Sequence, residues 1–255
     1  MLVSLVTLGQ SNMRELKDSI IRRFVVSSTT FADGGLPSIG GGIIIAGNYY
    51  ATCWHVIYQG NRRPVKTVVT FTRYSEQNTW VYDSTEVDYN YKAKLGQYDF
   101  SKHRYDTLVR SDFVVLKLKK PAPSVGYRVY RKHLAQKEFV YTRAPIETAP
   151  HVFEAKNTRC LATNDAYDFD QNKTAPPPCM VMYGAITQGS SGSPMYDSTG
   201  QVMGIVSKAA LNFNTLTEPF RKDPEVIEAY KNGQVQMLIL RMDYIVDKYL
   251  KGYLK

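Results

Sequence analysis

The chain has 255 residues, 44% of them hydrophobic, so it is long enough to bury a sizeable core. Its 32 basic and 23 acidic residues give a net charge of +9. Residues 1–8 are apolar, but this segment is too short and lacks the basic region of a signal peptide; we expect neither a signal peptide nor a membrane span. The three cysteines, an odd number, do not indicate a disulfide framework, so we expect an intracellular, reducing compartment.

The first predicted element is a helix over residues 12–26. Asn12 and Glu15 form a candidate capping box at its start. Apolar residues recur on one face at helical spacing, namely Met13, Leu16 and Ile20. We therefore assign residues 1–26 to an N-terminal helical extension.

Strands are predicted at short intervals from residue 27 to residue 120. Residues 40–52 predict a strand, a tight turn at Gly47-Asn48 and a second strand that leads to His55. Residues 73–110 are polar and rich in tyrosine, which indicates an extended hairpin or loop. Asp112 directly precedes an apolar strand, whereas the alternative aspartate, Asp106, lies in a more polar stretch.

The second half of the chain begins after a linker that we place at residues 121–134, because residues 121–124 read Pro-Ala-Pro-Ser. Residues 135–255 follow this linker as one segment. A short inserted helix is predicted near residues 223–231, because Asp223 supplies an N-cap and Pro224 the first helical position. This helix is either close to a substrate groove or a peripheral insertion.

The most informative motif is the hexapeptide at residues 189–194, which has the form G-x-S-G-x-P around Ser191. A serine hydroxyl is a weak nucleophile unless an imidazole takes its proton and a carboxylate orients that imidazole. His55, Asp112 and Ser191 supply these three groups. The flanking glycines allow a sharp turn, so that the backbone N–H groups of Gly189 and Ser191 can form an oxyanion hole.

Each of these residues also has a structural interpretation when taken alone. The hexapeptide could be a surface loop, His55 a hydrogen-bonded core histidine, and Asp112 the start of a strand. The three together, in this order along the chain, favour catalysis.

This order and the flanking segments resemble the chymotrypsin-like serine proteases. The resemblance rests on residues 40–52, 112–118, 189–194, 200–207 and 235–250, and so covers most of the chain from residue 40 onward. It implies an all-β-dominated fold of two antiparallel six-stranded β-barrels. The first barrel, residues 27–120, would carry His55 and Asp112. The second barrel, residues 135–255, would carry Ser191 and end in a C-terminal helix. It also implies an endopeptidase that forms an acyl-enzyme on Ser191.

Within this family, the chain is most similar to the picornavirus-like and nidovirus-like main proteases of positive-strand RNA viruses. An N-terminal helix and the lack of cysteines flanking His55 or Ser191 carry this likeness. It implies processing of a viral polyprotein, with host proteins as further substrates, in the host-cell cytoplasm. Because related viral enzymes commonly use cysteine as the nucleophile, a Cys→Ser replacement at position 191 stays open as an alternative.

The family's substrate-pocket positions correspond here to Ala185, Ile186, Val206, Ser207, Lys208 and Ala209. Val206 stands where picornavirus-type enzymes carry a histidine that recognises glutamine. A site that cannot hydrogen-bond an amide loses its strong discrimination for that amide, so we expect an apolar P1 residue. Lys208 is the exception, since its ammonium could favour an acidic P1 side chain.

The positive charge suggests a second function, RNA binding or a scaffold role on a protease fold. The basic clusters are Arg22-Arg23, Arg62-Arg63, Lys117 with Lys119-Lys120, and Arg128 with Arg131-Lys132. A solvated surface explains the same charge. We expect no cofactor and no metal site, because Cys53 and His55 are too close along one strand to share a face readily with Cys160 and Cys179.

Overall fold

The structure is a computed structural model, and it describes residues 25–59, 61–74, 76–77, 80–90, 94–95, 112–122, 129, 139–149, 152–164, 179–184, 188–210, 222, 224–231 and 235–249. Residues 12–24 of the predicted N-terminal helix lie outside the described residues. Its predicted end is wrong, because Val25 and Val26 already belong to strand β1. This segment alternates buried and partly exposed side chains and is rich in β-branched residues, a pattern that favours a strand.

The first half of the molecule consists of two antiparallel four-stranded sheets. One has the order β2-β1-β5-β6, with bounds Ser38–Gly41, Val25–Phe31, Pro64–Tyr74 and Trp80–Glu86. The other has the order β3-β4-β8-β7, with bounds Ile43–Ile45, Tyr49–Thr52, Val114–Lys117 and Lys94–Leu95. Only Gly42 separates β2 from β3, so the chain changes sheets at this glycine.

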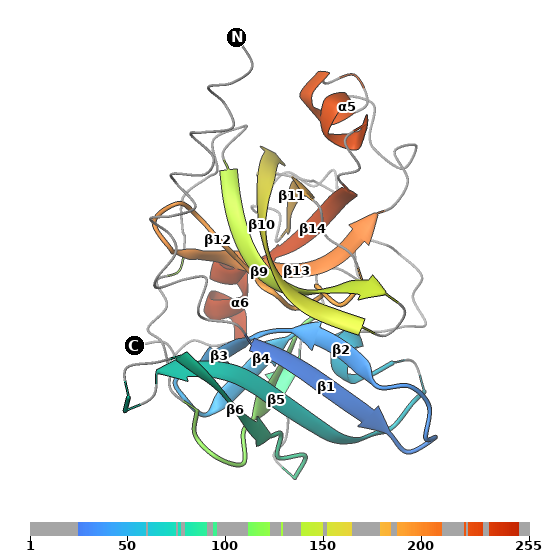
Figure 1. Cartoon of the computed structure of the whole chain (residues 1–255), viewed down its shortest axis with the longest axis vertical. Coiled ribbons are helices and arrows are strands. Elements are labelled where there is room, and N and C mark those ends of the chain that lie inside the picture. Colours follow the sequence, from blue (N-terminus) through green and yellow to red (C-terminus); the bar gives the residue numbers. More distant parts are fainter. Residues whose placement is uncertain are drawn as a thin grey trace.

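The second half is a closed six-stranded barrel (Figure 1). Its order is β10-β11-β14-β13-β12-β9, with bounds Val152–Asn164, Cys179–Gly184, Val235–Arg241, Val202–Ala210, Pro194–Tyr196 and Phe139–Ala149. The expected pair of six-stranded barrels is not confirmed, because the described strands of the first half form two sheets and no closed barrel. The boundaries that we assigned to the two barrels and to the linker stay predictions.

Three helices fall within the described residues. The single-turn α2, Trp54–Ile57, follows β4, and α6, Met242–Tyr249, follows β14 close to the predicted C-terminal helix. The predicted inserted helix is confirmed as α5, Pro224–Lys231. Figure 1 shows α5 at the end of the barrel remote from the first half, which favours the peripheral interpretation. No helix in the described part of the chain combines the length and apolar character needed to cross a bilayer.

The buried core consists of two hydrophobic clusters. The larger cluster fills the first half and continues into the second through residues such as Tyr196, Ile205 and Ile245. The smaller cluster lies within the closed barrel and is rich in methionine: Met182, Met195, Met203 and Met237. Because the larger core crosses the junction, groups from both halves are held in fixed positions there.

The turn between β3 and β4 differs by one residue from the prediction. Ala46 and Gly47 both have positive φ angles, 49° and 72°, and the N–H of Asn48 donates to the carbonyl of Ile45. Two central residues with positive φ are the geometry of a type I′ hairpin turn. The hairpin directs β4 back towards the junction, where it ends at Thr52, just before His55.

Candidate active site

His55 lies on α2 and faces the carboxylate of Asp112. The Nδ1 atom of His55 is 2.7 Å from Oδ2 of Asp112, and the backbone N–H of His55 donates to Oδ1 at 3.1 Å. An ionised carboxylate only accepts hydrogen bonds, so Nδ1 carries the proton and Nε2 is the acceptor. The side chain of His55 is 37% exposed and that of Asp112 is 6% exposed. The His55 side chain is therefore accessible to a substrate, whereas the Asp112 carboxylate is shielded from solvent.

Asp112 is held in place from three directions. It lies two residues before the start of β8, and its Oδ2 atom accepts a second hydrogen bond, of 2.7 Å, from the hydroxyl of Ser207 on β13. Burial by itself would raise the pKa of Asp112, but the charge of His55 and the hydrogen bonds from His55 and Ser207 outweigh it and hold this pKa below its usual value. The carboxylate is thus ionised and oriented towards the imidazole.

Ser191 lies on a turn in which two glycines have positive φ angles, 95° at Gly189 and 83° at Gly192. The turn is attached to both halves: the carbonyl of Ser191 accepts the N–H of Gly41 at 2.7 Å, and the N–H of Gly192 donates to the carbonyl of Val206 at 2.6 Å. Gly40 lies between this turn and α2. A Cβ atom added to Gly40 would be 2.9 Å from the carbonyl oxygen of Ser191 and 2.6 Å from the side chain of Val56 on α2.

The oxyanion donors that the sequence predicts belong to this turn. The N–H groups of Gly192 and Ser193 are used by the carbonyls of Val206 and Ser190. Within the described part of the chain, the N–H groups of Gly189 and Ser191 have no such backbone acceptor. This pattern is compatible with the predicted oxyanion hole, which stays a prediction.

The predicted pocket residues are only partly described. Ala185 and Ile186 lie outside the described residues, as do the side chains of Lys208 and Ala209, whose backbone belongs to β13. Val206 is buried in the methionine-rich cluster of the barrel. The sequence interpretation places Ser207 in the substrate pocket, and the structure directs its hydroxyl to Asp112. Ser207 therefore supports the orientation of the Asp112 carboxylate, and its place in the substrate pocket stays a prediction.

Cys53 lies beside the site, although the sequence predicted no role for it there. The Cys53 thiol is buried and donates to the carbonyl of Val206 at 3.1 Å, so it joins the segment before His55 to β13. Burial, followed by the nearby charge of Asp112, raises the pKa of this thiol well above its usual value. Cys53 acts as a neutral hydrogen-bond donor.

Cys53, His55 and Asp112 also form a group whose ligand atoms lie within 4.8 Å of one another. A zinc site would need a deprotonated thiolate, which this buried thiol beside a carboxylate disfavours. Oδ2 of Asp112 and Nδ1 of His55 are already bonded to each other. The chemistry of the three groups fits a hydrogen-bonded catalytic pair better than a metal centre.

Comparison with protein families identifies this arrangement. Residues 40–205, more than half of the chain, match the model described as trypsin-like peptidase domain. The chain belongs to the trypsin-like peptidase family. It is a chymotrypsin-like serine endopeptidase, and the matched residues include His55, Asp112 and Ser191.

Solved structures share the fold of this trypsin-like peptidase at low sequence identity. The active form of the Rv3671c protease from M. tuberculosis matches with a TM-score of 0.56 and 16% identity, over 98% of this chain and 88% of that one. The protein Deg5 matches with a TM-score of 0.51 and 14% identity, over 78% of this chain and 86% of that one. No curated protein matches the chain.

Proposed function

We propose that this peptidase cleaves peptide bonds through an acyl-enzyme on Ser191, with His55 as general base and then general acid. Ser191 Oγ attacks the scissile carbonyl carbon while Nε2 of His55 takes its proton; the N–H groups of Gly189 and Ser191 bind the oxyanion. His55 then gives the proton to the leaving amine, and a water hydrolyses the ester by the same route. Asp112 stabilises the imidazolium. The 2.7 Å contact between His55 and Asp112 is the observation that carries this proposal.

A fluorophosphonate probe followed by peptide mapping tests the assignment, because such probes label activated serines. We expect labelling at Ser191, and none in Ser191→Ala or His55→Ala, because the two groups act as one unit. A Ser191→Cys variant tests whether position 191 natively carries cysteine. If Ser191 does not label and Ser191→Cys cleaves peptides faster than the serine form, the protein is a cysteine protease and the serine assignment is overturned.

The proposal extends to an apolar P1 preference. Its support is Val206, an apolar residue where related enzymes carry a recognising histidine, together with its buried surroundings. A profiling library should return Leu, Met or Phe ahead of Gln, by a graded factor of roughly 10 to 200, because one methylene is worth only about 1–3 kcal/mol. A library that returns only Glu or Gln, with the Glu preference erased by Lys208→Ala, overturns this assignment.

We also propose that the substrate is a polyprotein, in a reducing compartment, as the likeness to viral main proteases suggests. The two cysteines whose side chains are described, Cys53 and Cys160, are buried free thiols, which suits such a compartment. Sequencing of new N-termini after incubation with a denatured lysate tests the proposal. A polyprotein-processing enzyme should cut few sites with a shared extended sequence, whereas cuts at many unrelated sites would contradict the proposal.

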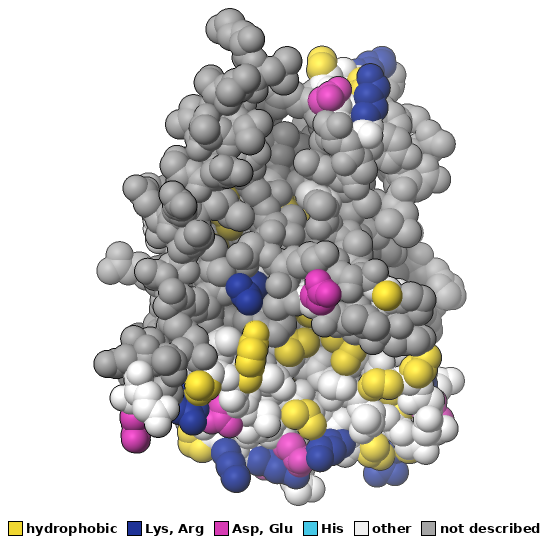
Figure 2. All heavy atoms as spheres, in the orientation of Figure 1, with side chains coloured by type: hydrophobic (Ala, Val, Ile, Leu, Met, Phe, Trp, Pro, Cys, Tyr) yellow, Lys and Arg dark blue, Asp and Glu magenta, His cyan; other side chains and the backbone are white. Residues whose placement is uncertain are grey.

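RNA binding is not part of the proposal, because several of the described basic side chains are engaged in ion pairs. Lys66 and Lys119 pair with Glu86, Arg62 with Asp33, and Arg73 with Asp83. Figure 2 shows basic and acidic side chains next to one another along the lower edge of the first half. Arg22 and Arg23, the first of the predicted clusters, lie outside the described residues.

A further inference from the structure

The backbone of Gly41 connects two buried hydroxyls to the backbone of Ser191. The Gly41 carbonyl accepts the Tyr50 hydroxyl at 2.8 Å and the Thr52 hydroxyl at 2.7 Å. The Gly41 N–H, which belongs to the preceding peptide group, donates to the carbonyl of Ser191 at 2.7 Å. The hydroxyls from β4 therefore fix the strand that holds the nucleophile turn.

The direction of these bonds follows from their surroundings. Tyr50 is fully buried, and burial raises the pKa of its phenol, so the hydroxyl stays protonated. A carbonyl can only accept, so the phenol donates to Gly41 and can accept from Ser27 Oγ, 2.9 Å away. The Tyr50 ring is pressed against Gly42, where an added Cβ would lie 2.1 Å from it. The ring has one well-defined position.

The nucleophile turn is fitted closely to the same groups. A Cβ atom on Gly192 would lie 2.2 Å from the Thr52 hydroxyl and 2.3 Å from the carbonyl oxygen of Gly41. A Cβ atom on Gly41 would lie 2.0 Å from the Ser193 hydroxyl. Gly192 and Ser193, which follow the nucleophile, thus lie directly against the Gly41 backbone, and Gly192 also lies against the Thr52 hydroxyl.

We infer that Tyr50, together with Thr52, is a positioning residue of this peptidase: through the Gly41 peptide its hydroxyl fixes the Ser191 turn. This inference rests on the proposed role of Ser191. The tyrosine touches neither substrate nor reacting atoms. Its loss should slow acylation and leave substrate binding almost unchanged.

Tyr50→Phe tests the inference, because it removes the hydroxyl and keeps the ring. Tyr89→Phe is the matched control, since the hydroxyl of Tyr89 is bonded to Thr67, away from the Gly41 peptide. In Tyr50→Phe we expect kcat, and the rate of fluorophosphonate labelling at Ser191, to fall by about 10- to 100-fold with KM changed less than about 2-fold, because small displacements of reacting groups are costly. Thr52→Val should act similarly, and the double variant should lose less than the product of the two effects.

Hydrogen exchange gives a readout that does not need activity. Amides of residues 40–42 and 189–193 should exchange faster in Tyr50→Phe than in wild type, and at the wild-type rate in Tyr89→Phe. Equal labelling and equal exchange in the two variants would overturn the inference. If wild-type protein does not label at Ser191, the proposed function fails, and exchange alone decides: faster exchange of the turn supports positioning by Tyr50, and unchanged exchange overturns it.

Discussion

Ser207 and Asp112 are joined across the two halves of the molecule. The Ser207 hydroxyl donates to the same Asp112 oxygen that holds the His55 ring, and both bonds are 2.7 Å long. With two donors on one oxygen, the carboxylate cannot rotate without breaking a hydrogen bond in a buried site. The orientation of the imidazole thus depends on a residue from the second half.

Ser207→Ala should lower kcat and leave P1 preference unchanged. A hydrogen bond to a charged group contributes about 1.5–3 kcal/mol, so we expect a loss of roughly 10- to 100-fold. Thr29→Val, which removes a buried hydroxyl that is bonded to Thr67 between β1 and β5, is the control. An altered P1 preference at unchanged kcat would return Ser207 to the substrate pocket.

Asp112→Asn should reduce kcat by about 10⁴, because an amide no longer selects the histidine tautomer with a free Nε2. The comparison with Asp106→Asn separates the two aspartates that the sequence offers. Asp106 lies outside the described residues, whereas Asp112 contacts His55. A nearly silent Asp112→Asn alongside a severe Asp106→Asn would show that the third catalytic residue is Asp106.

The three principal residues of the site could be found from the sequence because chemistry restricts their types. A serine on a glycine-flanked turn, a histidine after a strand and an aspartate before a strand leave few alternatives once their order is known. The role of Ser207 could not be found in this way. Its place on the strand after the nucleophile is readable, but the direction of its hydroxyl depends on how β13 packs against the first half.

Tyr50 and Thr52 were not predicted, because a strand pattern already accounts for a tyrosine and a threonine there. Their link to the Gly41 peptide depends on β2 and β4 lying in different sheets, which is a long-range property. The pairing of the first-half strands is equally non-local: β3 follows β2 after one residue, yet pairs with β4, while β2 pairs with β1. The closed second barrel came from the family resemblance, since periodicity predicts strands but not their neighbours.

Cys53 and Cys160 should resist alkylation in the folded protein. Both thiols are buried, and burial raises the pKa of Cys160 to about 12 and that of Cys53 well above its usual value. At pH 8 the thiolate fraction of both residues is therefore small, and their sulfur atoms are shielded from the reagent. Iodoacetamide treatment at pH 8 followed by peptide mapping should leave both residues unmodified, while the same treatment in urea should modify both. Labelling of Cys53 in active, folded protein would contradict its burial behind the catalytic pair.

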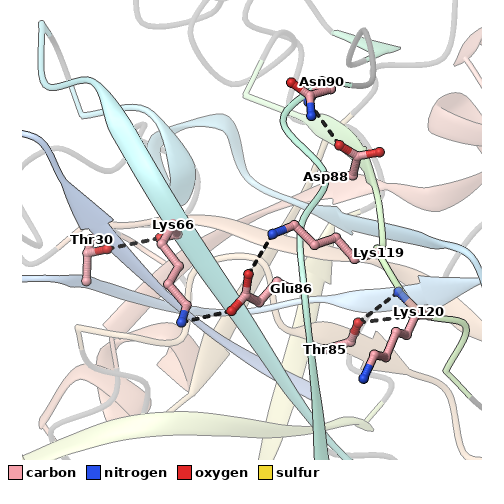
Figure 3. Close-up of polar contacts among 8 residues, drawn as sticks. All are labelled: Thr30, Lys66, Thr85, Glu86, Asp88, Asn90, Lys119 and Lys120. Atoms are coloured by element: carbon pink, nitrogen blue, oxygen red, sulfur yellow. Dashed lines mark hydrogen bonds and ion pairs between the residues drawn. The ribbon is translucent and has the colours of Figure 1, made fainter.

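The pH dependence of stability should contain a contribution from Glu86. The carboxylate of Glu86 forms ion pairs with the ammonium groups of Lys66 on β5 and Lys119 after β8, each with an N–O distance of 2.8 Å. Glu86 therefore connects the two sheets of the first half (Figure 3). The hydrogen bond from Lys119, followed by that from Lys66, lowers the pKa of Glu86 to about 2. A carboxyl whose pKa is lower in the folded than in the unfolded state stabilises the fold above its unfolded pKa and loses that effect as the pH falls.

Wild-type protein should therefore unfold at higher temperature than Glu86→Gln at pH 7, and the difference should shrink as the pH falls from about 4.5 towards 2. The group is exposed, so the effect should be small and should weaken further in 1 M salt. Glu76→Gln is the control, because Glu76 is also exposed and has no ion pair within the described part of the chain. Melting temperatures of the three proteins between pH 2 and pH 7 check this prediction. A difference between wild type and Glu86→Gln that is the same at pH 2 and pH 7 would mean that Glu86 contributes through packing and not through its charge.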